Sequence, residues 1–409
     1  MGSWDYVTVA ALLLVFAMLS RHLESRAVTP AIFFTTAGVI AGPVLGIVEL
    51  RLQSSIVKAI AEVALALVLF SGATRLSLAS LRGEYALPLR LLTIGMPLAI
   101  VAGAAAGVAV LPGVSLVEAL VLAVMLACTD SALGSTVVSD RRIPSTVRQG
   151  LTVESGLADG LGVPLFWIAL GLAQAEEGRM STAAAVRLVL EEIGYGTVAG
   201  LAAGLLGALA LRLAWRRGWV EPRWLQMLTL ASVVLAAGLA DRLHGSMFVA
   251  AFVGGLVFGA LRGSEGGEVT HFLDQGSDLA SAVTFAVFGA VILGPVLDDL
   301  TWQIVLYALL SLTLVRMAPT ALALLGTRAR TPTIAFVGWF GPRGLTTLVL
   351  GIILVTNSHL PHEQTLLIAV AFTVGLSIFA HGLTARPLAD RYVRWHELRP
   401  GSHAATDSS

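Results

Sequence analysis

The stretch from Ala127 to Thr136 reads Ala-Cys-Thr-Asp-Ser-Ala-Leu-Gly-Ser-Thr and lies inside an otherwise apolar run over residues 116–138. Its polar residues and its glycine interrupt a run that has the length of a membrane-spanning helix. A helix broken in mid-membrane exposes unpaired carbonyls and half-helix ends, and transporters use both to coordinate ions. The alternative is a helix that simply ends in a loop. However, the Arg141-Arg142 pair, which would mark the membrane surface, follows well after Asp130.

The composition of the whole chain is that of a polytopic membrane protein. Hydrophobic residues make up 56% of its 409 residues and charged residues 13%, with a mean hydropathy of +0.84, whereas soluble domains have about 45–50% and about 25%. The first apolar run lacks a basic N-terminal stretch and a cleavage site, so we expect a retained helix. Thirteen apolar runs approach the roughly 20 residues that a spanning helix needs, and they cover residues 4–20, 28–48, 57–76, 88–111, 116–138, 147–173, 188–213, 224–241, 246–261, 279–297, 302–325, 333–356 and 364–386.

Several functional classes are disfavoured by the same composition. The net charge is zero, which gives a nucleic-acid partner no electrostatic support. The single cysteine, Cys128, excludes an intrachain disulfide and a cysteine-rich zinc or iron–sulfur site. No nucleophile elbow or HExxH-like spacing supports a membrane-embedded hydrolase, so we expect no enzymatic activity and no cofactor.

The placement of basic residues predicts the orientation. If the N-terminus is outside, the inward connections and the C-terminal tail hold nineteen of the 26 Lys and Arg residues, and the outward connections hold five. Cytoplasmic loops carry the excess of such residues, so we expect a cytoplasmic C-terminus in a cell inner membrane. Residues 390–409 are predicted to form a short polar tail after one transmembrane domain over residues 1–389. Arg316 and Arg343 lie inside hydrophobic runs.

The sixth run contains Glu154-Ser155-Gly156-Leu157-Ala158-Asp159-Gly160. A charge at mid-membrane costs about 2.5–3.5 kcal/mol on insertion scales, so such residues are functional candidates. Ser155 and Asp159 are four residues apart and share one helix face, with Glu154 beside it. A structural carboxylate paired with an arginine is the alternative. Asp159 and Asp130, on consecutive helices beside Ser155 and a broken backbone, predict a binding site for a monovalent cation.

A second interrupted helix is predicted in the twelfth run, at Gly338-Trp339-Phe340-Gly341-Pro342-Arg343-Gly344. Pro342 removes a backbone donor and the glycines loosen the helix. If the seventh helix is a linker, runs 1–6 and 8–13 form two inverted six-helix repeats, each broken in its fifth helix, as in alternating-access transporters. Arg343 would neutralise helix ends or a carboxylate, or serve only structure. Arg316 is predicted to anchor neighbouring helices.

Taken in order, these stretches resemble the NhaP/NHE type of bacterial cation:proton antiporters, in the monovalent cation:proton antiporter superfamily. The resemblance covers most of the chain, and its specificity comes from the order and spacing of many motifs. Its motifs are Thr129-Asp130-Ser131-Ala132, Glu154 to Gly160, Leu243-His244-Gly245-Ser246, Ala251 to Leu256, Phe288-Gly289-Ala290, Gly294-Pro295, Leu314-Val315-Arg316, Gly338 to Gly344 and His381-Gly382-Leu383-Thr384-Ala385.

The resemblance implies a homodimer in the lipid bilayer, with interface helices at about 4–76 and 188–297. It implies a mobile core at about 88–173 and 302–386, in which helices 5 and 12 cross. Carried over by motif, Asp159 would alternate between proton and cation. Asp130, Ser155 and Thr129 would complete the ion's shell, with Glu154, Arg343 and Arg316 in support.

Two positions depart from the pattern that the resemblance implies. The family usually has Asn-Asp in the sixth helix, whereas this chain has Ala158-Asp159. Related electrogenic members have a second aspartate there, and because alanine carries no proton we expect electroneutral exchange. In the third helix many relatives have an acidic residue after Leu-Phe, where this chain has Ser71.

The function expected from these features is antiport of a monovalent cation, Na⁺ most favoured, against H⁺. Exchange of K⁺ for H⁺ on the same scaffold is the first alternative, and residue types alone do not separate the two ions. A cation channel is a second alternative, which the paired helix breaks disfavour.

Overall fold

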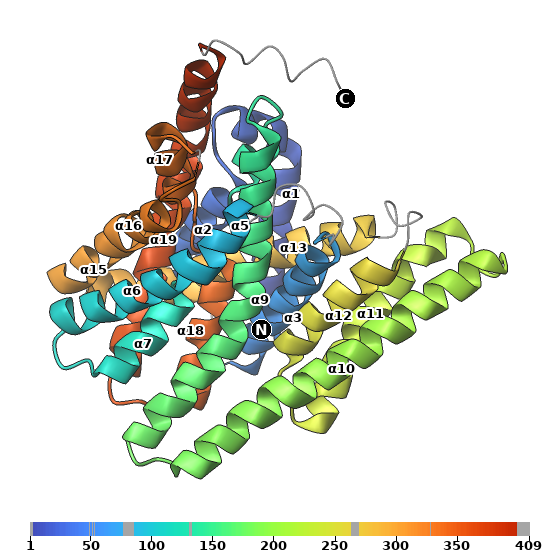
Figure 1. Ribbon diagram of the computed structural model, residues 1–409, viewed down its shortest axis with the longest axis horizontal. Helices are drawn as coiled ribbons and strands as arrows, with labels where there is room; N and C mark the ends of the chain where they lie inside the picture. The colour runs from blue at the N-terminus through green and yellow to red at the C-terminus, as the bar shows by residue number, and fades with distance from the viewer. Residues whose placement is uncertain are drawn as a thin grey trace.

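The computed structural model describes residues 3–48, 50, 52, 54–76, 86–130, 133–262, 270–327 and 329–398, and all regular structure in these ranges is helical. Three π-helical segments continue or join α-helices: η1 (Ile40–Val44), η2 (Leu91–Gly95) and η3 (Phe288–Leu293), and η4 (Leu297–Asp299) is a 3₁₀ turn. The α-helices, labelled in Figure 1, are α1 (Ser3–Ser25), α2 (Pro30–Val39), α3 (Ser55–Thr74), α5 (Ala86–Arg90), α6 (Met96–Val110), α7 (Leu116–Met125), α8 (Ser135–Val138), α9 (Ser145–Glu176), α10 (Thr182–Arg216), α11 (Pro222–Leu243), α12 (Met247–Leu261), α13 (His271–Val287), α14 (Gly294–Val296), α15 (Trp302–Leu312), α16 (Leu314–Ala323), α17 (Thr331–Trp339), α18 (Leu345–Asn357) and α19 (Glu363–Glu397).

Every one of the thirteen predicted runs coincides with a helical segment. Within the described residues, nine helical segments have the length and hydropathy of a membrane span, and four shorter apolar helices accompany them. The predicted breaks are confirmed, because α7 ends at Met125 before α8 begins at Ser135, and α17 ends at Trp339 before α18 begins at Leu345. One boundary differs: α19 continues to Glu397, into the segment predicted as a polar tail.

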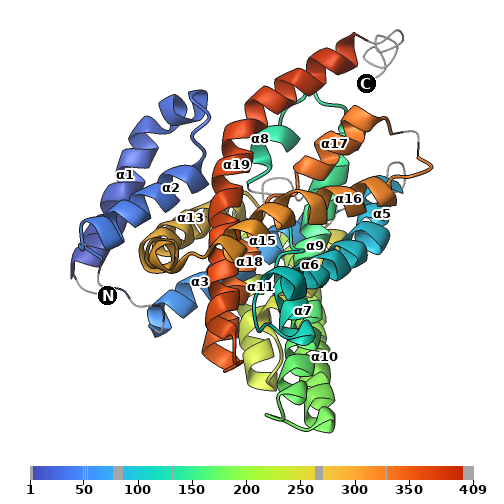
Figure 2. The same cartoon turned by 90° about the vertical axis from the view of Figure 1, so that its left-hand side faces the viewer.

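Two sets of helices make most of the packing contacts. In one set α3 and α10–α13 pack together with α2, and in the other α5–α9 pack with α15–α19. Figure 2 shows α1 and α2 on one side of α19, with α16, α17 and α5 on the other side. Glycines allow the closest approaches: a Cβ on Gly200 of α10 would lie 2.6 Å from the carbonyl oxygen of Ala250 in α12. Such small-residue contacts replace the hydrophobic driving force that is absent between helices in lipid.

A polar cluster joins the start of α7 to the α18–α19 connection. Ser115 and Glu118 form a capping box, in which each side chain accepts a hydrogen bond from the other's backbone N–H. The buried Glu118 carboxylate also accepts the backbone N–H of His362 at 3.0 Å and lies 2.9 Å from its Nδ1. The first turn of α7 is therefore bonded directly to the residue before α19.

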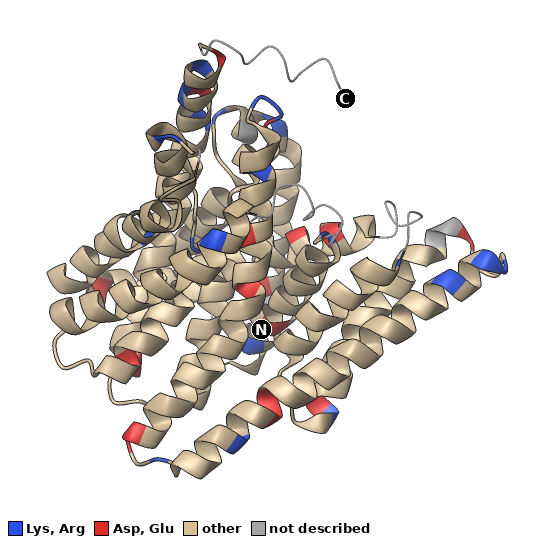
Figure 3. Ribbon diagram, in the orientation of Figure 1, with Lys and Arg blue, Asp and Glu red and all other residues tan. Residues whose placement is uncertain are grey.

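Basic residues gather toward one end of the molecule. In Figure 3 most Lys and Arg segments lie in the upper part of the view, near the ends of α1, α10 and α19. Several residues that entered the charge-based prediction lie outside the described residues, among them Arg51, Arg82, Arg328 and Arg399, as do Ser131 and Ala132 of the first motif.

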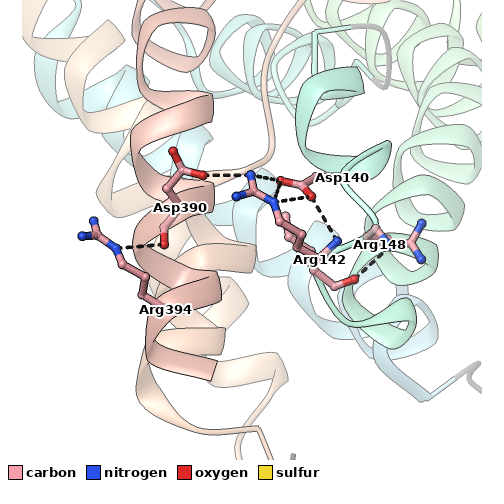
Figure 4. Close-up of polar contacts among 6 residues, drawn as sticks. Asp140, Arg142, Arg148, Asp390 and Arg394 are labelled. Atoms are coloured by element: carbon pink, nitrogen blue, oxygen red, sulfur yellow. Dashed lines mark hydrogen bonds and ion pairs between the residues drawn. The ribbon is translucent and has the colours of Figure 1, made fainter. Parts of the chain in front are cut away.

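At the same end, the connection between α8 and α9 is tied to α19. The Arg142 guanidinium donates from Nε to Oδ1 of Asp140 at 3.0 Å and from Nη2 to Oδ2 of Asp140 at 2.7 Å. Its Nη2 also donates to Oδ1 of Asp390 at 2.8 Å. Figure 4 shows Arg142 between the two aspartates, with Arg394 on the next turn of α19. Because of its hydrogen bond to Arg142, the pKa of Asp140 lies below its usual range.

Candidate functional site

The two broken helices meet backbone to backbone. The backbone N–H of Asp130, in the first break, donates to the carbonyl of Pro342 in the second break at 2.8 Å. The backbone N–H of Leu345, the first residue of α18, donates to Oδ2 of Asp130 at 2.8 Å. The Thr347 hydroxyl donates to the carbonyl of Met125, the last residue of α7, at 3.0 Å. The breaks therefore satisfy each other's orphaned backbone groups, which no water in a bilayer core would satisfy.

Asp130 acts as an N-cap that comes from another helix. The N-cap residue of α18 is Gly344, which has no side chain to cap with, and a Cβ built on it would collide with the Asp130 carboxylate. Glycine at this position therefore leaves room for the carboxylate at the positive end of α18. The other oxygen of Asp130, Oδ1, accepts a longer hydrogen bond from the backbone N–H of Leu133 at 3.4 Å.

Arg343 supplies the positive charge at the centre of the crossing. It is 1% exposed, and its Nη1 donates to the carbonyl of Cys128 at 3.1 Å, just beyond the C-terminal end of α7. A cation at that end complements the helix dipole. Arg343 therefore lies where it can neutralise the end of α7. Its backbone N–H donates to Oγ of Ser377 in α19 at 2.7 Å.

Asp159 lies in the long helix α9 that packs against this crossing. The residue is 5% exposed, and its Oδ1 has no hydrogen-bond partner among the described residues. Thr346 of α18 is hydrogen-bonded to the carboxylate, and its charged neighbours are Asp130 and Arg343. One turn before, the Thr129 hydroxyl donates to Oγ of Ser155 at 3.3 Å. The fold thus brings the predicted carboxylates and hydroxyls to one place, with one carboxylate oxygen free to accept a ligand.

Glu154 and Arg316 form a buried ion pair beside this site. Nη1 of Arg316 lies 2.6 Å from Oε1 of Glu154 and Nη2 lies 2.9 Å from Oε2, with side-chain exposures of 6% and 3%. This two-pronged geometry is the strongest arrangement of an Arg–carboxylate pair. The Arg316 guanidinium also lies against Gly341, where a Cβ would collide with it. Arg316 therefore links α16 to α9 and to the second break.

Ala158 precedes Asp159 and is 2% exposed. Its methyl group offers no hydrogen bond to the site, and the Glu154 carboxylate takes its charge-assisted bonds from Arg316. Ala158 is therefore the position at which the site lacks a polar group that the family pattern described above would supply.

Some contributors were missed or underrated from the sequence. Ser377 and His381 lie one turn apart on α19, where the Ser377 hydroxyl is 3.0 Å from Nδ1 of His381. Nε2 of His381 is 3.0 Å from the carbonyl of Trp339 at the end of α17. Together they hold both ends of the second break. One sign of Ser377 and His381 was present in the sequence, because they are two polar residues at i and i+4 in an apolar helix. No feature of the neighbouring sequence identified Thr346 as a neighbour of Asp159.

A model of the family described as "Sodium/hydrogen exchanger, transmembrane" matches residues 8–391, nearly the entire chain. The chain belongs to the sodium/hydrogen exchanger family. The resemblance expected from the motifs is thereby confirmed, and so is the expected all-helical class with broken fifth and twelfth helices.

Individual members of this family and solved structures are similar over most of the chain. The Na⁺/H⁺ antiporter NhaP of Pseudomonas aeruginosa is 30% identical over 79% of this chain and 78% of its own length. A probable Na⁺/H⁺ antiporter of Schizosaccharomyces pombe is 25% identical over 67% of this chain, which spans only 40% of that protein. The structure of the sodium proton antiporter MjNhaP1 from Methanocaldococcus jannaschii superposes with a TM-score of 0.76 at 22% identity, covering 95% of this chain and 98% of that one. That likeness identifies the fold.

Proposed function

We propose that this family member exchanges a monovalent cation, Na⁺ most favourably, for H⁺ by alternating access at Asp159. The observation that supports this most directly is a buried carboxylate with a free oxygen, Oδ1, beside the crossing of two broken helices. Two relatives of the chain are also named as Na⁺/H⁺ antiporters. Na⁺, K⁺ and H⁺ are substrates in this proposal.

Competition at one carboxylate would couple the two ions. Burial favours the neutral, protonated form of a carboxyl group, and a nearby cation favours the ionised form. Asp159 would therefore hold either H⁺ or the metal cation, and each would exclude the other. If the occupied forms reorient and the bare charged form does not, exchange follows with no separate coupling device.

The cation's shell would combine Asp159 with the hydroxyl oxygens of Thr129 and Ser155. Asp130 would contribute mainly its negative field, because both of its oxygens accept hydrogen bonds from backbone N–H groups. An ionised carboxylate has about four lone-pair sites, so a direct contact with the cation stays compatible with those bonds. Glu154, Arg316 and Arg343 would position the site and not bind the ion, and Ala158 would leave it with a single proton carrier.

The test of the site is Asp159→Asn in proteoliposomes that contain a pH-sensitive dye. We expect loss of Na⁺-driven proton movement, since the amide neither ionises nor takes up a proton, with normal yield and normal size-exclusion behaviour. The matched control is Asp298→Asn, an exposed aspartate in η4 between α14 and α15, which should retain activity. Unchanged Na⁺/H⁺ exchange in Asp159→Asn would reject the assignment.

Selectivity and stoichiometry are tested in the same vesicles. Separate additions of Na⁺, K⁺ and Li⁺ distinguish Na⁺/H⁺ from K⁺/H⁺ exchange, and flux without saturable counter-transport would point to a channel. Because Ala158 carries no proton, we expect one-for-one exchange. Equal rates with and without a clamped membrane potential support this expectation, and clear potential dependence contradicts it.

The proposed setting is a homodimer in the cell inner membrane, with the N-terminus outside and the C-terminus in the cytoplasm. The interface helices would be those at about 4–76 and 188–297, and the mobile core those at about 88–173 and 302–386. The two packing sets described above support this division, and the arginine-rich end supports the orientation.

A further inference from the structure

We propose that a cavity at the arginine-rich end of the molecule binds a phosphate-bearing anion, supplied by the headgroup of an anionic lipid. The cavity has a volume of about 310 Å³ and lies between the α1–α2 connection, the short helix α8 and the last third of α19. The polar residues that line it are Thr29, Ser135, Thr136, Ser139 and Arg386. None of Asp130, Asp159 and Arg343 lines it, so it is separate from the exchange site.

The lining selects for negative charge. Among the described residues that line the cavity, Arg386 is the one charged residue and none is acidic. Nη1 of Arg386 donates to the carbonyl of Ser25 at 2.7 Å, which fixes the guanidinium and leaves its other N–H donors available. Arginine presents these donors in a planar fork that matches the oxygens of a phosphate group.

The depth of the cavity indicates the source of the anion. Arg386 is the residue at which the last apolar run ends, and Thr29 lies at the start of the second run. Both residues therefore lie near the level of lipid headgroups, where long basic side chains extend toward the membrane surface. Gly382 forms part of the wall one turn before Arg386, and a Cβ there would lie 3.5 Å from Oγ1 of Thr29. Hence α19 approaches the α1–α2 connection closely on the side of the cavity nearer the membrane core.

The cavity also joins the two packing sets. Thr29 caps α2, which packs with α13, whereas Ser135 and Arg386 belong to α8 and α19, which pack with each other. A phosphate group held by both sides would add a contact between the sets, so we expect binding to stabilise the folded protein.

The experiment uses the full chain purified in neutral detergent, with short-chain phosphatidylglycerol, short-chain phosphatidylcholine and inorganic phosphate as separate probes. Binding is measured by native mass spectrometry and by the shift in unfolding temperature. We expect phosphatidylglycerol to bind and stabilise, and phosphatidylcholine to do neither. Arg386→Gln should weaken phosphatidylglycerol binding about tenfold, the order expected for one charge-assisted contact. The control Arg394→Gln removes an exposed arginine of the same helix and should bind like the unmodified protein.

The outcomes separate the possibilities. Equal affinity of the unmodified protein and Arg386→Gln for phosphatidylglycerol overturns the site, as does equal binding of phosphatidylcholine. Stabilisation by inorganic phosphate that Arg386→Gln abolishes supports the anion site and replaces the lipid by a free anion. Arg386→Lys guards against misfolding of the Gln variant, and it should bind with intermediate affinity because it retains charge and loses the fork. Because each readout is binding, failure of the proposed exchange activity leaves this test intact.

Discussion

At the scale of single residues, the buried charged side chains near the crossing bind a helix end or a side chain of opposite charge. Asp130 caps α18, Arg343 bonds a carbonyl beyond α7, and Arg316 pairs with Glu154. Among the buried carboxylates of the described residues, Asp159 is the one with an oxygen that has no hydrogen-bond partner. Buried polar groups are otherwise hydrogen-bonded as a rule, so an unpartnered carboxylate oxygen identifies the position that a ligand would complete.

The two roles of Asp130 can be separated by substitution. Asp130→Asn keeps a side-chain oxygen for the backbone N–H of Leu345, so its unfolding temperature should remain close to that of the unmodified protein. Asp130→Ala removes the cap and should lose about 0.5–2 kcal/mol of stability. If the negative field of Asp130 serves the cation, both variants should show weaker apparent Na⁺ affinity. Normal Na⁺ affinity in Asp130→Asn would confine Asp130 to capping.

The Glu154–Arg316 pair is expected to show strong coupling in a double-mutant cycle. Glu154→Gln or Arg316→Gln alone leaves an uncompensated buried charge and should cost about 3–5 kcal/mol of unfolding free energy. The double variant should cost clearly less than the sum of the two single changes. The measurement is unfolding in mixed micelles.

An exposed ion pair provides the control cycle. Nε of Arg187 lies 2.7 Å from Oε1 of Glu191 on α10, and the Arg187 side chain is 79% exposed. Pairs of this kind at i and i+4 couple by about 0.3–0.5 kcal/mol. Additive effects at Glu154 and Arg316, of the size seen in this control, would show that the buried contact contributes little.

At the scale of helices, the central feature is that the C-terminal end of α7 and the N-terminal end of α18 meet. α7 ends at Met125 and α18 begins at Leu345. The backbone N–H of Asp130 donates to the carbonyl of Pro342 between the helical parts, and Thr347 of α18 donates to the carbonyl of Met125 in α7. The long helix α9 lies directly against the first break, because Gly162 has no side chain. A Cβ at Gly162 would collide with the sulfur atom of Cys128.

This contact gives a prediction with a built-in rescue. Gly162→Ala should destabilise the protein by about 1–3 kcal/mol, as overpacking of a close contact does. Cys128→Ala in the same chain removes the sulfur atom and should recover most of the loss. The comparison is the unfolding free energy of the double variant against Cys128→Ala alone. A double variant no more stable than Gly162→Ala would show that another neighbour limits the space.

Hydropathy and breaker residues were sufficient to predict this level of structure. All thirteen helical segments and both breaks follow from apolar run length and from Gly, Pro and polar residues within the runs. The partners across the breaks were not predictable, because they depend on which half-helices cross. Asp130 as the cap of α18, and Thr346 beside Asp159, join residues more than 180 positions apart. No local pattern encodes such a pairing.

At the scale of the whole molecule, the two packing sets and the arginine-rich end define the proposed division into interface and core. The connection between α8 and α9 is fastened to α19 at that end through Arg142. All three charged groups of this bridge lie beyond the apolar runs 116–138, 147–173 and 364–386, so pH acts on them directly.

The bridge should weaken only in acid. The hydrogen bond from Arg142 holds the pKa of Asp140 below its usual value of 3.8. The ionised Asp140 carboxylate therefore stabilises the bridge fully above about pH 4. The contribution disappears as the pH falls through the lowered pKa of the folded state. Backbone hydrogen exchange of residues 139–144, normalised for intrinsic rates, should therefore be unchanged between pH 8 and 5 and rise below pH 4.

Asp140→Asn should show the faster exchange at every pH, because its amide cannot form the ion pair. Asp390→Asn is the control that keeps the Asp140–Arg142 contact and removes only the contact with α19. A rise in exchange that begins between pH 7 and 5 would contradict the low pKa of Asp140.

The bond between Glu118 and His362 has a mechanical consequence. α7 is attached to the α18–α19 unit at two separated places, at its first turn through this bond and at its last turn through Thr347. A rod fixed to a second body at two points along its length cannot rotate independently of that body. During a transport cycle α7, α18 and α19 would therefore move together as one rigid body. The backbone would then have to bend in the loops that connect these helices to the rest of the chain.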